Sequence, residues 1–539
     1  MKAPILDQFD KIHNQRFNYE SEWQAISEIL DPESAAFTST NTNGYVSRRN
    51  IWDSTPERAV DDLVSSMMAM LAMPDKEWGT LNTESPERNL NYEEELALQV
   101  ATGKCLAHFA RSKTNFYNAE ADTLVDVAIY GQGYTYMYPD YRKKIVKFAN
   151  VPVQECYAQR DAYGKLTSWY RKFSMTPIEM YNEFSDSKHN SMRADQKKNV
   201  KDKIKHDPAY KYEVIQAIMS KTEAEAIGLK VDSNKAWVQV FADQETRATL
   251  HIDYLKWFPV LAPSWVRKAK SPYGRGRGHK ALPEIRVLNK MIITNLTAGE
   301  TMVNGAKMVP YEIFPTGQLD NSPGALNWYS ISDAMVGTGV IKPEDLTNVT
   351  NLPISLEMEN FRRQQISEIF FADLLQEFKN AEMSATESTV RNLSRTRKMS
   401  SPLMRFQDEY LAQAFDFVYH ALIDFKIIEV PDSLKQEDMT VSFTTGLHEA
   451  YQMGKLQQLE RGMQAVANTK GIPPELLPEL NEEEFIKFVF THAGASLQVL
   501  EEPGRAREKR EEQQQLQASQ VAVNQAQALR QVSEAQQAL

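Results

Sequence analysis

In the second half of the chain, two stretches of helical periodicity flank a segment that lacks this periodicity. Residues 282–302 place apolar side chains on one helical face, and residues 353–378 do the same after Pro353, a residue suited to a first helical turn. The intervening residues 303–352 are rich in Gly, Pro, Asn and Thr and contain short strand-like runs. We therefore expect two long helices that bracket a small β-rich excursion. Such an arrangement buries enough surface only when several copies stand side by side.

The apolar positions of these two helices define the faces that need a partner. They are Leu282, Ile285, Leu288, Ile292 and Leu296 in the first helix and Phe361, Ile366, Ile369, Phe370 and Leu374 in the second.

The first half of the chain combines helical and strand-like patterns. Helical periodicity covers the opening residues to about 35, residues 51–73 and most of residues 91–130. Residues 176–230 are interpreted as a charged, helix-rich insertion. Strand signals occupy residues 134–140, 143–175 (with a turn at Asp161–Gly164), 235–244, 248–257 and 258–268. The fold class predicted for this half is α+β.

Local signals mark the starts of two helices. Ser54 and Glu57 have the spacing of a capping box before an apolar stripe. Ser384 and Glu387 repeat this spacing at the start of a long helix that ends near residue 425. We expect that long helix to bend at Pro402.

Charge and cysteine content exclude several classes of protein. A net charge of −11 and a pI near 5.5 argue against tight binding of nucleic acid over the whole surface, because such binding requires Lys and Arg to neutralise phosphates. Cys105 and Cys156 are too few for a disulfide framework or a four-cysteine zinc site, so a reducing compartment is expected. The N-terminus lacks the apolar core of a signal peptide, and the apolar residues 63–73 are too short to span a membrane. We expect a soluble chain made in the cytosol.

The stretch SPYGRGRGHKALPEI (271–285) is the strongest candidate for a nucleotide site, but its spacing fits poorly. Gly274, Gly276 and Gly278 give G-x-G-x-G, whereas dinucleotide sites need G-x-G-x-x-G and P-loops need G-x-x-x-x-G-K-S/T. A nucleotide-dependent hydrolase that uses the turn 274–278 is therefore the alternative function. The simpler interpretation is a turn that leads into a helix, with Arg275 and Arg277 in solvent or against another chain.

Catalytic and metal-binding patterns do not stand out. The nine histidines are scattered, with no H-E-x-x-H motif, and no G-x-S-x-G motif occurs. We therefore expect no catalytic residues, no metal and no cofactor.

Four segments occur in the order typical of the portal, or head-to-tail connector, proteins of short-tailed bacteriophages. They are DSTPERAVDDLVSSMMAMLAMPDKEWGTL, VPVQECYAQRDAYGKLTSWYRKF, SPYGRGRGHKALPEIRVLNKM and MSATES. The chain resembles this family over roughly residues 5–460, and the resemblance rests on the order of the segments and on chain length. It implies a mainly helical α+β portal fold that forms a ring and has no enzymatic activity.

The resemblance implies a division of the chain into the regions of a portal. These are a wing (1–277), a first stem helix (278–302), a clip (303–352), a second stem helix (353–375), a tunnel loop (376–388), a long wing helix (389–440), a crown (441–504) and a C-terminal tail (505–539). The tail has helix-forming composition with a thin apolar stripe, so it is either an ordered helical barrel or disordered.

The function implied by the resemblance is that of a ring, usually of twelve subunits, at one capsid vertex of the virion. The ring would be assembled in the host cytoplasm and would conduct double-stranded DNA during packaging and ejection, without sequence specificity. Its implied partners are the terminase large subunit, the major capsid and scaffolding proteins and a tail adaptor, with no membrane. A third interpretation is a structural protein inside the capsid that forms no ring.

Individual residues acquire roles by their place in these regions. Arg362, Arg363 and Lys379 are the candidates for contact with DNA in the channel, and the tunnel loop contains Asn380, Glu382 and Met383. Candidate residues for contacts between subunits are Arg275, Arg277, Glu357 and Glu359. An alternative role for Arg362 and Arg363 is ion pairing with Glu357 or Glu359 of a neighbouring subunit.

Overall fold

The structure is a computed structural model that combines helices and antiparallel sheets, in agreement with the predicted α+β class. The chain divides into two compact units, residues 1–74 with 109–417 and residues 75–108 with 418–539, which we describe separately. The described residues are 4–34, 36–38, 51–74, 76–83, 90–185, 192, 194–229, 231, 234–268, 271–303, 307–308, 335–336, 339–340, 344–345, 352–372, 398–431, 433–434 and 439–443.

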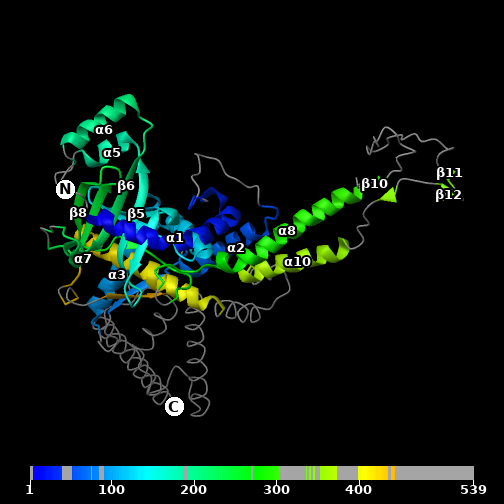
Figure 1. The fold of residues 1–539 in the computed structure, drawn as a ribbon. Helices are drawn as coiled ribbons and strands as arrows, with labels where there is room; N and C mark the ends of the chain where they lie inside the picture. The colour runs from blue at the N-terminus through cyan, green and yellow to red at the C-terminus, as the bar shows by residue number, and fades with distance from the viewer. Residues whose placement is uncertain are drawn as a thin grey trace, which may run out of the picture. The chain divides into compact units, whose positions relative to one another are not determined.

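A five-stranded antiparallel sheet forms the centre of the first unit, with strand order β4-β5-β6-β7-β8 (Figure 1). Its strands are β4 (Cys156–Arg160), β5 (Leu166–Met175), β6 (Tyr212–Ser220), β7 (Trp237–Asp243) and β8 (Ala248–Leu255). The turn predicted at Asp161–Gly164 joins β4 to β5, where Gly164 has a positive φ of 87° and its N–H donates to the Asp161 carbonyl at 3.0 Å.

Strand β6 was not predicted, because it lies inside the segment interpreted as a helix-rich insertion. Helices α5 (Pro177–Phe184), α6 (Ala194–His206) and α7 (Lys221–Ala226) are indeed there, but β6 lies between α6 and α7 as the middle strand of the sheet. Its sequence YEVIQAIMS is a nearly continuous apolar run because both faces of the strand are covered. Such a run has no alternation that would identify it as a strand.

Helices cover both faces of this sheet, as the alternation of buried side chains requires. Helix α1 (Pro4–Leu30) packs Ile5 and Phe9 against one face, which includes Ile215. Helices α5 and α6 pack against the other face, which includes Val214 and Leu250. Figure 1 shows α1 crossing the sheet and α5 with α6 beyond it.

A second, three-stranded sheet has the order β3-β2-β9. Its strands are β2 (Thr135–Asp140), β3 (Ile145–Asn150) and β9 (Val260–Leu261), and helix α4 (Phe116–Tyr130) packs against it. Short 3-10 turns lie at Pro32–Ser34, Ser112–Thr114 and Val153–Glu155. The strand signals at 134–140 and 143–175 are thereby confirmed.

Helix α2 (Thr55–Leu71) buries its predicted apolar stripe, but the predicted capping box is wrong. Ser54 occupies the cap position without a side-chain hydrogen bond to the helix. The carboxylate of Asp53 instead accepts the Thr55 N–H at 2.7 Å. Asp53 therefore supplies the hydrogen-bond acceptor at the start of α2 that the pattern assigned to Ser54.

The two predicted long helices are present, and they lie side by side (Figure 1). Helix α8 (Arg277–Val303) begins five residues before the periodic segment 282–302 and one residue before the predicted stem helix 278–302, and it contains Pro283. Helix α10 (Leu352–Ile369) ends before the predicted residue 378. Phe371 follows α10 with a positive φ of 59°. Between the helices, β10 (Lys307–Met308) pairs with β13 (Glu344–Asp345), and β11 (Met335–Val336) pairs with β12 (Gly339–Val340), both antiparallel.

The late helix contains a π-helical turn. Residues 398–406 are α-helical, Gln407–Leu411 is the π-helical turn, and α13 continues over Ala412–Asp424. The bend predicted at Pro402 is thus not the irregularity in this helix, because Pro402 lies within regular α-helix. The predicted capping pair Ser384 and Glu387 lies outside the described residues.

The second unit pairs segments that are far apart in the sequence. Strand β1 (Gly79–Thr83) runs antiparallel to β14 (Met439–Phe443), a pairing that the sequence analysis did not predict. Helix α3 (Tyr92–Phe109) presents Thr102, whose Oγ1 accepts the Leu81 N–H at 3.0 Å. The predicted crown beyond residue 443 and the C-terminal tail lie outside the described residues.

Candidate functional site

The glycines of the stretch 271–285 lie against the C-terminal end of α4. A Cβ on Gly274 would come within 2.1 Å of the Gly131 carbonyl oxygen, and one on Gly276 within 2.6 Å of the Ala128 oxygen. One on Gly278 would come within 2.5 Å of a carbonyl oxygen of the same helix end. None of the three glycines has a positive φ, so they are required for close approach rather than for a left-handed turn.

The G-x-G-x-G spacing follows from this packing. Gly274 and Gly276 precede α8 and lie two positions apart, so in extended chain both point to the same side, whereas Gly278 meets the same helix end from the first turn of α8. That side is filled by protein atoms, which leaves no phosphate cradle there. The nucleotide-dependent hydrolase therefore loses the feature on which it rested.

The carboxylate of Glu409, on the π-helical turn, binds the segment that contains Ser264 and Arg267. Glu409 Oε2 accepts both the N–H and the hydroxyl of Ser264 at 2.8 Å, and Glu409 Oε1 lies 3.3 Å from Arg267 Nη2. Ser264 forms a β-bridge with Gln132, whose Oε1 accepts the Gly274 N–H at 3.3 Å. One hydrogen-bond network thus joins the π-helical turn, the end of α4 and residues 274–278, which we call the glycine segment.

His279 closes the first turn of α8. Its Nδ1 accepts the Gly276 N–H at 3.2 Å, which requires that nitrogen to be unprotonated. Burial lowers the pKa of His279 to about 4; the Glu22 carboxylate opposes this shift and the Arg275 guanidinium adds to it.

The two arginines of the glycine segment have different surroundings. Arg275 Nη2 lies 3.5 Å from Glu22 Oε2 of α1, and the Arg275 side chain is 54% exposed. The Arg277 guanidinium carbon lies 5.3 Å from the Trp265 ring centroid and 4.1 Å from that of Phe371, and burial lowers the pKa of Arg277. Contacts of both arginines with a second subunit stay predictions, for which Arg275 has the exposure required.

Arg362 and Arg363 lie on α10 and are held by carboxylates of their own chain. Arg362 Nη1 donates to Glu284 Oε2 of α8 at 2.6 Å. Arg363 Nε donates to Asp53 Oδ2 at 2.8 Å, and its Nη2 donates to Glu359 Oε2 at 3.2 Å. The charge that each arginine would offer to a DNA phosphate is already shared with an acid, so their contact with DNA stays a prediction.

The Asp53–Arg363 pair fixes α10 to the start of α2. Burial alone would raise the pKa of Asp53, but hydrogen bonds from Thr55 and Arg363 outweigh it and hold that pKa below its usual value. The same pairing, together with Glu359, raises the pKa of Arg363 against its own desolvation. Both partners are therefore charged at neutral pH.

The two glutamates proposed for contacts between subunits differ in exposure. Glu359 is 5% exposed and accepts a hydrogen bond from Asn295 of α8 in addition to that from Arg363. Glu357 is exposed and has no ion-pair partner in the part of the chain that the structure describes. Glu357 is therefore open to another chain, whereas Glu359 belongs to the α8–α10 contact. Lys379, Asn380, Glu382 and Met383 lie outside the described residues.

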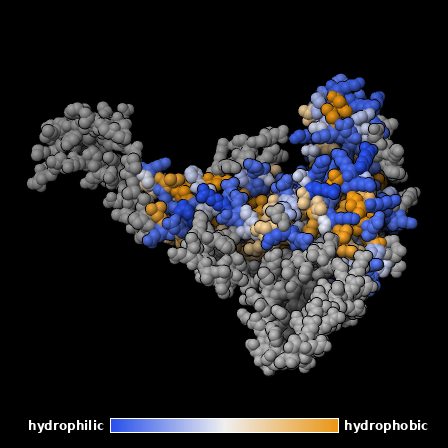
Figure 2. Space-filling model, turned by 180° about the vertical axis from the view of Figure 1, so that it is seen from behind, coloured by the Kyte–Doolittle hydropathy of each residue, from blue (hydrophilic) through white to orange (hydrophobic). Residues whose placement is uncertain are grey.

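Several apolar residues of α8 and α10 are exposed in the single chain. Leu296 and Phe361 are 52% and 55% exposed, whereas Leu282, Ile285, Leu288, Ile366 and Phe370 are buried. Figure 2 shows hydrophobic residues interspersed with hydrophilic ones over this helix pair. The exposed apolar residues are Val287, Leu296, Leu356, Met358 and Phe361. Met358 and Phe361 lie three positions apart on one side of α10, and we call these two the outer apolar face.

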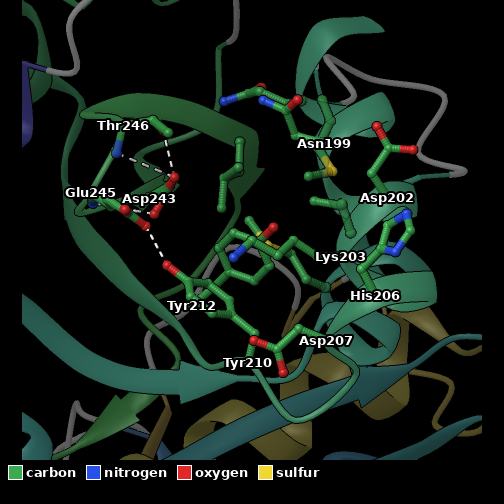
Figure 3. A pocket seen from close by; sticks show the side chains of 15 residues that line it. Asn199, Asp202, Lys203, His206, Asp207, Tyr210, Tyr212, Asp243, Glu245 and Thr246 are labelled. Atoms are coloured by element: carbon green, nitrogen blue, oxygen red, sulfur yellow. Dashed lines mark hydrogen bonds between the residues drawn. The ribbon is translucent and has the colours of Figure 1, made fainter.

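A cavity of about 480 Å³ lies between α6 and the turn that joins β7 to β8 (Figure 3). Tyr210 donates its hydroxyl proton to Glu245 Oε2 at 2.6 Å, which raises the pKa of Tyr210 to about 12. Asp243 accepts from the backbone N–H and the hydroxyl of Thr246. These acids serve the local structure, and no group of three or more metal-binding side chains occurs among the described residues.

Comparison with known proteins identifies the class to which this arrangement belongs. A family model described as bacteriophage head to tail connecting protein matches residues 2–500. The chain therefore belongs to the bacteriophage head-to-tail connecting protein family, which confirms the resemblance found in the sequence. No helix among the residues described above is long and apolar enough to cross a membrane.

Individual relatives carry the name of portal proteins. The chain is 24% identical over 490 residues to a "Probable portal protein" of Bordetella phage BPP-1, covering 89% of this chain and 85% of that protein. It is 23% identical over 513 residues to a "Portal protein" of Salmonella phage epsilon15, covering 93% and 88%. A solved chain from the virion of a native gene transfer agent particle matches with a TM-score of 0.35 and 9% identity, covering 78% of this chain and 91% of that one.

The close packing of the glycine segment predicts a large cost for a single added methyl group. Gly276→Ala would place a Cβ 2.6 Å from backbone atoms Ala128 O and Gly131 N, which cannot move without displacing α4. We expect a loss of roughly 1–3 kcal/mol in the free energy of unfolding, measured by chemical denaturation. The control is Gly103→Ala, a helical site with nothing within 4 Å, where a gain of about 0.5–1 kcal/mol is expected. An equal response of the two variants would contradict the proposed packing.

The neutral His279 predicts a defined pH dependence of stability. Its pKa is lowered in the folded chain, so the unfolded chain binds a proton more readily, and stability falls as the pH decreases from about 6.5 to about 4. His279→Asn keeps an acceptor for the Gly276 N–H but cannot be protonated. The melting temperature of this variant should fall less between pH 7 and pH 5 than that of the wild type. Parallel profiles would show that His279 does not titrate in this way.

Proposed function

We propose that this chain is a portal protein that forms a ring, usually of twelve subunits, at one vertex of the phage capsid. The ring conducts double-stranded DNA during packaging and ejection, and it provides the attachment site for the terminase and the tail. The observation that carries the proposal is the set of exposed apolar residues on α8 and α10, in a chain that belongs to the head-to-tail connecting family.

The helix pair is well suited to make contacts with copies of itself. On its inner side, the ion pairs Arg362–Glu284 and Arg363–Asp53 fix the two helices to each other and to α2. Burial of its outer apolar face would stabilise the assembly by about 25 cal/mol for each Å² of apolar surface removed from water. A neighbouring copy would cover this face, and the exposed side chains of Arg275 and Glu357 would form polar contacts at the edge of the same interface.

The remaining partners follow from the same proposal. Residues 303–352 between the helices would form the clip that meets the tail adaptor and the terminase large subunit. The wing would contact the major capsid and scaffolding proteins. DNA would pass Arg362, Arg363 and Lys379 without base-specific recognition, and weak contacts would let it slide.

Substitution of Phe361 tests the ring and its interface together. Phe361 is 55% exposed on α10, so Phe361→Asp should leave the folded chain intact while placing a charge in the apolar contact between copies. We expect mass photometry to find the wild type near twelve times 61.6 kDa and the variant mainly as single chains. Negative-stain images of the wild type should show an axial hole.

The matched control is Ile178→Asp, which charges a 48% exposed apolar residue on α5, far from the helix pair in the sequence. This variant should assemble as the wild type does. A wild-type chain that stays a monomer at high concentration would contradict the ring and would favour a structural protein that forms no ring. An assembled Phe361→Asp ring would contradict the interface but not the ring.

A further inference from the structure

The turn between β2 and β3 carries three adjacent cations. It consists of Tyr141, Arg142, Lys143 and Lys144, all of them exposed. β9 pairs with Thr135 and Tyr136 at the start of β2, and the Met137 N–H donates to the Pro259 carbonyl at 2.8 Å, so from Tyr138 to the turn β2 and β3 form a two-stranded ribbon. We call residues 137–148 the basic ribbon.

The positive charge of the basic ribbon is not neutralised by its own acid. The Asp140 carboxylate accepts the backbone N–H groups of Arg142 at 3.2 Å and Lys143 at 3.1 Å, and it pairs with Lys147 Nζ at 3.4 Å. These bonds lower the pKa of Asp140 and leave the side chains of Arg142, Lys143 and Lys144 without an ion pair among the described residues. Many other arginines of the first unit, such as Arg362, are paired within the chain.

Exposed tyrosines lie beside these cations. Tyr138 is 55% exposed and stands opposite Lys147 in the β2–β3 register, and Tyr141 is 62% exposed. The opposite face of the ribbon is anchored in the core by Met137, Val146 and Phe148. The register of the ribbon is thereby fixed, and its basic and aromatic side chains are held on the solvent side.

We propose that the tip of the basic ribbon, residues 141–144 with Tyr138, binds the phosphate backbone of duplex DNA without reading its sequence. The choice of DNA as the ligand rests on the proposed portal function, whereas the site itself rests on the ribbon. Three cations in consecutive positions match the dense charge of a duplex, which carries one negative charge per roughly 1.7 Å of its axis. A two-stranded ribbon also fits a groove of DNA, and tyrosine hydroxyls donate to phosphate and sugar oxygens.

This site is separate from the channel residues suggested by the sequence. Arg362 and Arg363 already share their charge with Glu284 and Asp53, whereas the cations of the ribbon have no such partner. The ribbon therefore offers DNA three charges at no cost in broken ion pairs.

The test is a triple variant, Arg142→Ala, Lys143→Ala and Lys144→Asn, of the full-length protein. Asparagine is used at position 144 because the φ of Lys144 is +52°, a region in which asparagine is common. Asp140 binds backbone N–H groups, so the turn itself should persist in the variant. Binding to a fluorescent 30-base-pair duplex is followed by anisotropy at several NaCl concentrations. We expect the slope of log K against log salt to become shallower by about 2.7 for each ribbon engaged, that is, about 0.9 for each lost cation.

The matched control removes three exposed lysines from α6, Lys198→Ala, Lys201→Ala and Lys205→Ala. Because it removes the same charge, this control should keep the wild-type slope if binding is local to the ribbon. Equal changes in the two triple variants would overturn the site in favour of diffuse attraction. A ribbon variant that binds DNA as the wild type does, or a wild type that does not bind DNA at low salt, would overturn it as well.

Mass photometry of the same samples separates this inference from the proposed function. If the ribbon variant loses assembly but not affinity for DNA, the ribbon is an interface between copies, and the inference is wrong. If the wild type forms no ring but the ribbon alone sets the salt slope, the DNA site stands while the portal proposal fails.

Discussion

The approach of the glycine segment to the C-terminal end of α4 is so close that no side chain fits between the two backbones. Gly274, Gly276 and Gly278 each face carbonyl oxygens of α4 or of Gly131 directly after it. Helix α8 starts within this contact, so its origin is fixed by backbone atoms rather than by adaptable side chains. The position of α10 follows, since α10 is held to α8 by Arg362 and Glu359.

The helix pair combines a closed inner side with an open outer side. Charged and polar groups of the inner side, such as Asp53 and Arg363, are satisfied within one chain, whereas Leu296 and Phe361 remain in contact with water. These partly exposed ion pairs hold α10 to α8 and to the start of α2. The proposed ring would cover the apolar residues that the single chain leaves exposed.

Much of this fold can be predicted from periodicity, and the predictions that were wrong or missing have physical reasons. Helices α1, α2, α8 and α10 were found because one apolar face repeats along them. Strand β6 was missed because both of its faces are covered, which removes the alternation. The cap of α2 was assigned to Ser54, although Asp53 offers a nearby acceptor that the pattern does not consider.

For the site, the sequence identified residues but not their partners. The glycines were noticed through their spacing, yet their reason lies in α4, well over a hundred positions earlier in the chain. Arg363 was singled out by its charge, but a pattern cannot show that Asp53 neutralises it. Periodicity also revealed that Phe361 belongs to an apolar face without indicating whether the same chain covers that face.

The π-helical turn at Gln407–Leu411 constrains the number of residues in the late helix. A π-helical turn contains one residue more than a regular turn, and here it presents Glu409 to Ser264 and Arg267. Loss of that extra residue would rotate everything on one side of it by about 100° relative to the other side. During evolution of the gene, single-codon insertions and deletions should therefore accumulate in surface turns and be purged from the stretch that precedes Glu409.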